Sequence, residues 1–273
     1  MKKAAVLIPL YKNFLDKEEI LSFNQCQKVL GKHEIIIFGP ESLDFDYYIT
    51  LFERNSNLRV VTFADKYFIN IHGYNKLMLS SLFYQKFVKY EYILIYQLDS
   101  WVFRDELEYW CNKKFHYIGA PWFADFNQAS EKSNFIGVGN GGFSLRHVST
   151  YIKAIRHFKR IRFFLSFLDR CRVKGKYKSI IIKISELFLD YKFNSEIIKI
   201  MTIEKTNEDY ILSHCMSTIF NYINVAKSDQ ALKFSFEVNP HILFKLNNYS
   251  LPFGCHAFLK YNPEFYKYYI QLD

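Results

Sequence analysis

The sequence predicts an α/β protein with a Rossmann-type mixed, mainly parallel sheet flanked by helices. Short apolar runs alternate with amphipathic helical patterns through the first half of the chain. Repeated strand–helix–strand units of this kind favour a parallel sheet with right-handed crossovers. The run 92–96 is apolar or aromatic throughout, as expected of a strand that helices cover on both faces. The chain has 273 residues, half of them hydrophobic, which is enough for a sizeable core.

In the first half we expect strands separated by helices. The first helix ends at Gly31, and Gly39-Pro40 stops the second strand. The strands are expected at residues 4–10, 33–38, 58–63 and 92–96, and the helices at 17–30, 44–54 and 74–88.

The second half is less regular. We expect a strand at 116–120, a polar loop at 125–137, a helix from about Val148, a helical stretch at 210–220 and a strand at 234–238. There is no internal repeat and no low-complexity linker. A single domain over residues 1–273, with a basic helical insertion at about 151–183, is therefore the simplest organisation.

Asp99 is the single acid that follows the apolar run 92–96. A buried strand has no use for an unpaired carboxylate, because burying the charge is costly. Open α/β sheets bind ligands at the carboxyl ends of their parallel strands. Asp99 is therefore a candidate site residue, and the alternative is a strand-end aspartate that caps the next turn.

Residues 139–142 combine three glycines with Asn140. Glycine allows the backbone to approach a ligand closely and to reach positive φ. The stretch is not a Walker loop, because no Gly-Lys-Ser/Thr follows, and it is not a GxGxxG turn after the first strand. It is either a tight turn or a loop that lines a substrate.

Glu208 and Asp209 are adjacent acids at the start of the helical stretch 210–220. One explanation is structural: acids in a first helical turn complement the helix dipole, and Asn207 is a suitable N-cap. The other is that one carboxylate acts as a general base on a hydroxyl group. Because consecutive helical positions diverge by about 100°, the two carboxylates cannot share one role.

His256 lies between apolar neighbours after the last predicted strand. Most histidines in such settings are core or edge residues, and a metal-ligand role is the alternative. Asp99 and His256 together would offer one oxygen and one nitrogen. This pair suits Mn²⁺ or Mg²⁺ if a substrate diphosphate supplies further oxygens, and it is too small for a closed zinc site.

Positive charge is concentrated in the segment 151–183, which holds eleven Lys or Arg and one acid, whereas the whole chain has a net charge of +9. Apolar residues such as Phe163 and Phe167 are interleaved with these cations. We favour a basic amphipathic helix on an anionic membrane surface, with a solvated helical face and a nucleic-acid-binding face as alternatives. The sequence has no RRM, KH or zinc-finger signature, so we expect no nucleic-acid partner.

Cysteine usage and hydropathy predict a cytoplasmic protein. The five cysteines are scattered and include no CxxC pair, which favours a reducing compartment over a disulfide framework. The apolar run 4–10 is too short for a secretory signal. No segment reaches the roughly 20 apolar residues of a membrane span, so any attachment to a membrane is expected to be peripheral.

Four motifs in chain order resemble those of GT-A glycosyltransferases. They are the acid motif 96–103, the Gly-Gly loop 139–146, Asn-Glu-Asp at 207–209 and Gly-Cys-His at 254–256. More narrowly, the chain resembles a bacterial family described as a domain of unknown function and regarded as glycosyltransferases. More distantly, it resembles β-1,3- and β-1,4-galactosyltransferase-type enzymes. The resemblance covers about residues 4–260 and implies a GT-A-like fold, with 1–105 as the nucleotide-binding half and 106–273 as the acceptor and catalytic half.

The resemblance also implies roles for individual residues. Asp99 falls on the last acid of the DxD motif, which binds the metal at the donor diphosphate, and His256 falls on the late histidine that completes this site. Gln97 replaces the first Asp of the motif and is suited to hydrogen bonding with a ribose or sugar. Asp209 falls on the base of inverting members, beside Glu208. The implied donor-binding residues further include Asn140, Gly141 and Gly142 in the loop, and Asn75 and Lys76 at a helix start near the nucleotide.

These roles predict an inverting glycosyltransferase that uses Mn²⁺ or Mg²⁺ and a nucleotide sugar, with a UDP-hexose as the expected donor. The expected acceptor is a lipid-linked glycan of bacterial surface polysaccharide synthesis, such as capsule or O-antigen. The segment 151–183 is expected to hold the enzyme on the inner face of the cell membrane. The alternatives are a retaining glycosyltransferase, a sugar nucleotidyltransferase of the same fold, and a non-catalytic basic membrane-binding adaptor.

Overall fold

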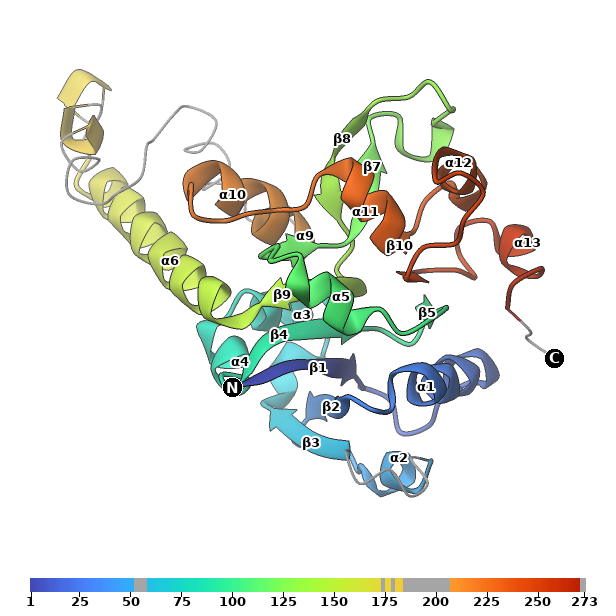
Figure 1. The fold of residues 1–273 in the computed structure, drawn as a ribbon. Coiled ribbons are helices and arrows are strands. Elements are labelled where there is room, and N and C mark those ends of the chain that lie inside the picture. Colours follow the sequence, from blue (N-terminus) through green and yellow to red (C-terminus); the bar gives the residue numbers. More distant parts are fainter. Residues whose placement is uncertain (52–57, 173–174, 178–179, 184–206, 271–273) are drawn as a thin grey trace.

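The computed structural model describes residues 1–51, 58–172, 175–177, 180–183 and 207–270. At its centre is a six-stranded sheet with the order β3-β2-β1-β4-β9-β6 (Figure 1). β1 pairs in parallel with both β2 and β4, whereas β9 runs antiparallel to its neighbours β4 and β6. The expected mixed, mainly parallel sheet is confirmed. The strands are β1 Lys2–Pro9, β2 Glu34–Pro40, β3 Leu58–Phe63, β4 Tyr90–Tyr96, β6 Tyr117–Ile118 and β9 Phe143–His147.

Helices cover both faces of the sheet. Side chains alternate between the faces along each strand, so Ala5 and Leu7 of β1 join one apolar layer, while Val6 and Ile8 join the other. The first layer is covered by α3 Ile71–Met78, α4 Ser81–Gln85 and α6 Val148–Arg170, and the second by α1 Lys17–Leu30 and α5 Leu107–Asn112. This two-sided burial explains the unbroken apolar run of β4.

One expected helix of the first half is wrong. Instead of a single helix at 74–88, the chain forms α3, capped by the Asn70 side chain, and then α4. The hydroxyl of Ser80 accepts a hydrogen bond from the Leu82 amide at 3.2 Å, and this N-cap starts a new helix where periodicity suggested continuity. The expected helix 44–54 is the short α2, Asp46–Leu51, and residues 52–54 lie outside the described part.

The chain between β6 and β9 forms a second, two-stranded sheet. β7 Ala120–Phe123 pairs antiparallel with β8 Phe135–Gly139, so the expected strand 116–120 is split and the expected loop 125–137 is partly a strand. The split falls at Gly119, where a Cβ atom would lie 1.7 Å from the Gly139 carbonyl oxygen. Pro121 is accommodated because β7 has a free edge.

The last third of the chain closes over one end of the sheet. The helical stretch expected at 210–220 is α9 Glu208–Tyr210, a π-helical turn Ile211–Cys215 and α10 Met216–Ile219. A three-stranded sheet of β10 Ser235–Phe236, β11 Gly254–Cys255 and β5 Trp101–Val102 then ties the tail to the segment that follows β4. This part of the chain also contains α11 Ser228–Phe234, α12 Pro240–Leu246 and α13 Pro263–Tyr266, and 3₁₀ turns lie at Asp65–Tyr67 and Phe126–Gln128.

α6 accounts for much of the basic segment 151–183. It starts beside the sheet and its far end extends outward (Figure 1). Its buried residues recur at helical spacing, among them Ile155, Phe158 and Ile161, whereas its cations are exposed. The helix is therefore amphipathic, as predicted. Among the residues that the structure describes, no helix combines the length and the apolar character needed to cross a bilayer.

Candidate functional site

The carboxyl ends of β1 and β4 border a pocket of about 930 Å³. The chain adds β2 and β3 on one side of β1 and then adds β4 on the other side. Open α/β sheets bind ligands at the point where the order of strands changes sides in this way. Tyr11 follows β1 and Gln97 follows β4 on the pocket wall. The predicted residues that line the pocket are Asn75, Gln97, Gly141, Gly142, Glu208, Asp209 and His256. Asp99 lines an adjoining hollow of about 190 Å³, which shares Tyr11 and Gln97 with the main pocket.

His256 lies between two carboxylates. Its Nε2 atom is 3.2 Å from Oδ1 of Asp99, and its Nδ1 atom is 3.1 Å from Oε1 of Glu237. The Oε1 atom of Gln97 is also 3.3 Å from Nε2. Asp99 and His256, which lie far apart in the sequence, are thus in direct contact, as the metal hypothesis requires.

The charges around His256 determine its protonation. Burial alone would lower the pKa of the imidazole, but Asp99 and Glu237 outweigh this effect and raise the pKa of His256 to about 10. Burial would likewise raise the pKa of Asp99, and the neighbouring His256 instead lowers it. In the absence of a bound cation, a positively charged imidazole therefore bridges the two acids.

The Gly-Gly loop is a rigid wall of the pocket. Asn140 has φ of 78°, and its side-chain oxygen accepts hydrogen bonds from the amides of Gly142 and Phe143, both at 3.1 Å. A Cβ atom on Gly142 would lie 2.1 Å from Nε2 of His256, and one on Gly141 would lie 2.4 Å from Oε1 of Glu208. Glycine is therefore required at both positions for the loop to pass close to these side chains.

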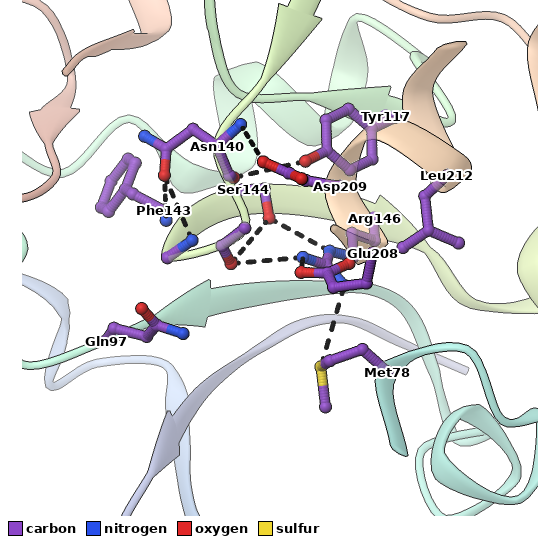
Figure 2. Close-up of polar contacts among 12 residues, drawn as sticks. Met78, Gln97, Tyr117, Asn140, Phe143, Ser144, Arg146, Glu208, Asp209 and Leu212 are labelled. Atoms are coloured by element: carbon purple, nitrogen blue, oxygen red, sulfur yellow. Dashed lines mark hydrogen bonds and ion pairs between the residues drawn. The ribbon is translucent and has the colours of Figure 1, made fainter. Parts of the chain in front are cut away.

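Glu208 forms a buried ion pair with Arg146. The Arg146 guanidinium donates to Oε1 of Glu208 at 2.9 Å, and both side chains are almost fully buried. It also donates to the Gly141 carbonyl at 3.2 Å and, through Nε, to the Ser144 hydroxyl at 3.0 Å (Figure 2). Burial would lower the pKa of Arg146, but Glu208 raises it well above its usual value; burial also raises the pKa of Glu208, and Arg146 opposes that effect. This network fixes the Gly-Gly loop to the strand that follows it.

Asp209 presents a second carboxylate to the pocket. Its Oδ2 atom accepts a hydrogen bond from the Asn140 amide at 3.0 Å (Figure 2). Its Oδ1 atom accepts one from the Tyr210 amide at 2.8 Å. It is half-buried, whereas Glu208 is fully buried. Burial, followed by the negative charge of Glu237, raises the pKa of Asp209. The two adjacent acids thus have different environments, and only Asp209 has no cationic partner in direct contact among the described residues.

Three predicted residues occupy places that differ from the expectation. Lys76 is exposed and is not among the residues that line the pocket. Asn140 is buried behind the loop, where it positions the backbone instead of facing the cavity. The side chain of Asn207 makes no capping hydrogen bond at the start of α9.

Sequence reasoning missed two charged residues of the pocket. Glu237 directly follows β10, the same strand-end position that drew attention to Asp99. Lys260 is the only Lys or Arg on the pocket wall within the described residues. It lies four residues after His256. Burial raises the pKa of Asp99, His256 lowers it, and Lys260 lowers it further by a smaller amount.

The donor atoms around His256 fit a divalent cation. Two ligands at about 2.1 Å from one octahedral ion stand about 3 Å apart, and Oδ1 of Asp99 and Nε2 of His256 are 3.2 Å apart. Across the part of the chain that the structure describes, no three His, Cys, Asp or Glu side chains form a complete metal site. A cation held by Asp99 and His256 would therefore need further oxygen ligands, and the side-chain carbonyl of Gln97 lies close enough to supply one.

The family described as "Protein of unknown function (DUF5672)" matches residues 57–256 of the chain. No curated protein matches. Among solved structures, an active-site mutant of LgtC is similar to this chain with a TM-score of 0.51 and 11% identity, covering 92% of this chain and 86% of that one. The galactosyltransferase LgtC in complex with donor and acceptor sugar analogues has a TM-score of 0.48, 11% identity and the same coverage. Core-mannan synthase A from Aspergillus fumigatus in its Mn/GDP form has a TM-score of 0.42 and 10% identity, covering 59% of this chain and 65% of that one. The likeness to the LgtC mutant supports a GT-A-like fold.

Proposed function

The chain belongs to the DUF5672 family, and from its GT-A-like fold and its pocket we propose that it is a glycosyltransferase. It transfers a sugar from a nucleotide sugar to an acceptor hydroxyl and inverts the anomeric centre. The observation that carries this proposal is that Asp209, a carboxylate without a cationic partner in direct contact among the described residues, shares one pocket with His256 and Gln97. The volume of about 930 Å³ is suited to a nucleotide sugar.

The donor diphosphate is proposed to lie at the His256 end of the pocket. Asp99 and His256 would hold a divalent cation there, and a bound Mn²⁺ or Mg²⁺ would neutralise the charge that develops on the leaving diphosphate. Lys260 adds a basic side chain to the same wall. Gln97, which hydrogen-bonds toward His256 at 3.3 Å, is placed to contact the ribose or the sugar. UDP is the proposed nucleotide and a hexose the proposed sugar.

Asp209 is proposed as the general base. As the acceptor oxygen bonds to the anomeric carbon, its proton passes to the Asp209 carboxylate, and the bond between that carbon and the diphosphate breaks, with the electron pair leaving on the diphosphate. The raised pKa of Asp209 strengthens it as a proton acceptor. Glu208 is engaged with Arg146 and supports the donor loop without moving a proton.

The acceptor is proposed to be a glycan. Trp122 and Tyr210 line the pocket next to Asp209, and their ring planes are within 24° of parallel. The negative faces of aromatic rings attract the C–H groups on the apolar face of a sugar ring. A lipid-linked glycan of bacterial capsule or O-antigen synthesis is the proposed acceptor class.

The basic segment is proposed to hold the enzyme on the inner face of the cell membrane. Phe163 and Phe167 are 68% and 50% exposed on α6, one helical turn apart, and exposed cations such as Arg162 flank them. Exposed aromatic side chains combined with Lys and Arg are typical of helices that lie on anionic lipid. A non-catalytic adaptor would use the same surface but would tolerate changes at Asp209.

Substitution of the proposed base tests the function. We expect Asp209→Asn to lower kcat for sugar transfer by about 10²–10⁴-fold, because the acceptor loses its proton acceptor, while UDP binding in the presence of Mn²⁺ changes little. Asp229→Asn, at an exposed aspartate in α11, is the matched control and should retain wild-type turnover. Wild-type turnover of Asp209→Asn would contradict the assignment.

The product distinguishes the alternatives. NMR of the product from a screen of UDP- and GDP-sugars should show inversion at the anomeric carbon. Retention would favour a retaining glycosyltransferase, and release of pyrophosphate in place of the nucleoside diphosphate would favour a nucleotidyltransferase.

A further inference from the structure

The two ring nitrogens of His256 face different partners. Nε2 lies 3.2 Å from Oδ1 of Asp99 and within hydrogen-bond distance of Gln97 at 3.3 Å, whereas Nδ1 is within hydrogen-bond distance of Oε1 of Glu237 at 3.1 Å. The lone-pair directions of the two imidazole nitrogens diverge across the ring. Glu237 Oε1 and Asp99 Oδ1 therefore lie on opposite sides of His256, and they are not placed to bind one ion together.

The backbone fixes the contact between Glu237 and His256. β10 and β11 pair in parallel with Phe236 opposite Cys255, which brings the next residue of each strand side by side. The His256 amide donates to the Phe236 carbonyl at 3.0 Å, which continues this pairing by one residue. The side chains of Glu237 and His256 are only 16% and 14% exposed. Glu237 is thus held against the ring by the sheet and does not reach it from a mobile loop.

The orientation of the imidazole ring is also restricted from the other side. Gly142 passes so close that a Cβ atom there would lie 2.1 Å from Nε2 and 2.8 Å from Oε1 of Gln97. The ring is therefore confined between the Gly-Gly loop and the tail, with Nε2 3.2 Å from Oδ1 of Asp99.

A histidine that binds a metal through one nitrogen usually donates the N–H of the other to a carboxylate or carbonyl, which sets the tautomer and the orientation of the ring. We propose that Glu237 is a positioning residue that accepts a hydrogen bond from the Nδ1–H group of His256 and so keeps Nε2 available, beside Asp99, as a ligand for a divalent cation. This inference rests on the cation site of the proposed function. It adds Glu237, which contacts the histidine and not the cation.

The affinity for Mn²⁺ tests this role directly. Mn²⁺ binding to the full chain in the presence of UDP is measured by electron paramagnetic resonance of free Mn²⁺. We expect Glu237→Ala to weaken Mn²⁺ binding by about 10–100-fold, which is the usual effect of removing the hydrogen-bond partner of a metal-binding histidine. Glu237→Gln keeps the size of the side chain and an oxygen acceptor, so its affinity should fall between those of Glu237→Ala and the wild type. Glu264→Ala, at an exposed glutamate in α13, is the control and should match the wild type.

The tautomer of His256 is a readout that a purely structural role would not change. In the Mg²⁺-loaded protein, ¹⁵N NMR of labelled histidine should show His256 protonated at Nδ1 in the wild type, and this signature should be reduced in Glu237→Ala. Equal Mn²⁺ affinity of wild type and Glu237→Ala would overturn the role of Glu237 while leaving the cation site intact. Absence of Mn²⁺ binding by the wild type with UDP would overturn the cation site itself and this inference with it.

Discussion

At the residue scale, the two adjacent carboxylates of the candidate site, Glu208 and Asp209, have different surroundings. Glu208 and Asp209 are neighbours in sequence, yet the first is paired with Arg146 and the second accepts only backbone hydrogen bonds among the described contacts. Glu208 is fully buried and its Oε1 atom is paired with Arg146, whereas Asp209 is half-buried at the pocket and has no cationic partner in direct contact among the described residues. This separation of roles is the physical reason to assign proton transfer to Asp209 alone.

The close approach of Gly142 to His256 gives a prediction for this glycine. Gly142→Ala places a methyl group 2.1 Å from Nε2 of His256, so the ring or the loop must shift. We expect Mn²⁺ and UDP to bind at least about 10-fold more weakly, since ligand geometry is lost before the fold is affected. Isothermal titration calorimetry with UDP and Mn²⁺ measures this change. Gly137→Ala is the control, because a Cβ there would be 3.9 Å from its nearest neighbour, Trp122, and unchanged binding in both variants would contradict the prediction.

At the scale of elements, the sequence predicts the sheet better than the segments that complete the pocket. The strands β1, β2 and β4 follow from their apolar runs, because burial on both faces leaves a strong local signal. The break between α3 and α4 depends on one Ser80 hydroxyl, and β8 depends on pairing with β7, so neither has a comparable signal. Asp99 is conspicuous as a single acid after an apolar strand. Glu237 follows a strand of only two residues and becomes recognisable only through its contact with His256.

Glu34 gives a prediction for the stability of the sheet. It starts β2 and contacts Lys2 of β1 and Lys89, the residue before β4. Burial alone would raise the pKa of Glu34, but the two lysines outweigh it and lower the pKa to about 2. The folded state thus binds the Glu34 proton less tightly than the unfolded state. Its stabilising contribution is present above the ordinary value of 4.5 and is lost as the pH falls toward about 2.

We therefore expect Glu34→Gln to lower the free energy of unfolding at pH 7 by up to about 1 kcal/mol, because the lysines are largely exposed. The difference from the wild type should shrink steadily below pH 4.5. Urea denaturation across this pH range measures it, with Glu41→Gln at an exposed position as the control. A difference between wild type and Glu34→Gln that does not depend on pH would argue against the ion pairs as its source.

At the scale of the whole molecule, the pocket and the basic segment are separate surfaces. No residue of α6 is among those that line the pocket within the described part of the chain. The buried side chains of α6 belong to the apolar layer on one side of the sheet, and its outer face carries Phe163, Phe167 and the cations. Changes on the outer face should consequently alter where the protein binds and leave the chemistry of the pocket unchanged.

This separation predicts the behaviour of the double variant Phe163→Ser/Phe167→Ser. We expect wild-type protein to float with vesicles that contain anionic lipid, more strongly at low salt than at high salt. The double variant should lose about 100-fold or more in vesicle binding, because burying one Phe side chain contributes about 1.5–3 kcal/mol and two are removed. Transfer to a water-soluble acceptor should be unchanged. Tyr268→Ser, at an aromatic residue that is 86% exposed in the tail, is the matched control and should float like the wild type.

The outcomes of this experiment distinguish the three interpretations of the basic segment. If the wild type does not float at low salt, the outer face of α6 is a solvated surface and membrane attachment is wrong. If the double variant floats like the wild type, lipid binding does not use this face. If the double variant loses both flotation and transfer to a soluble acceptor, the two surfaces are not independent. Retained transfer with lost flotation is the result that a catalytic pocket beside a separate membrane-binding helix requires.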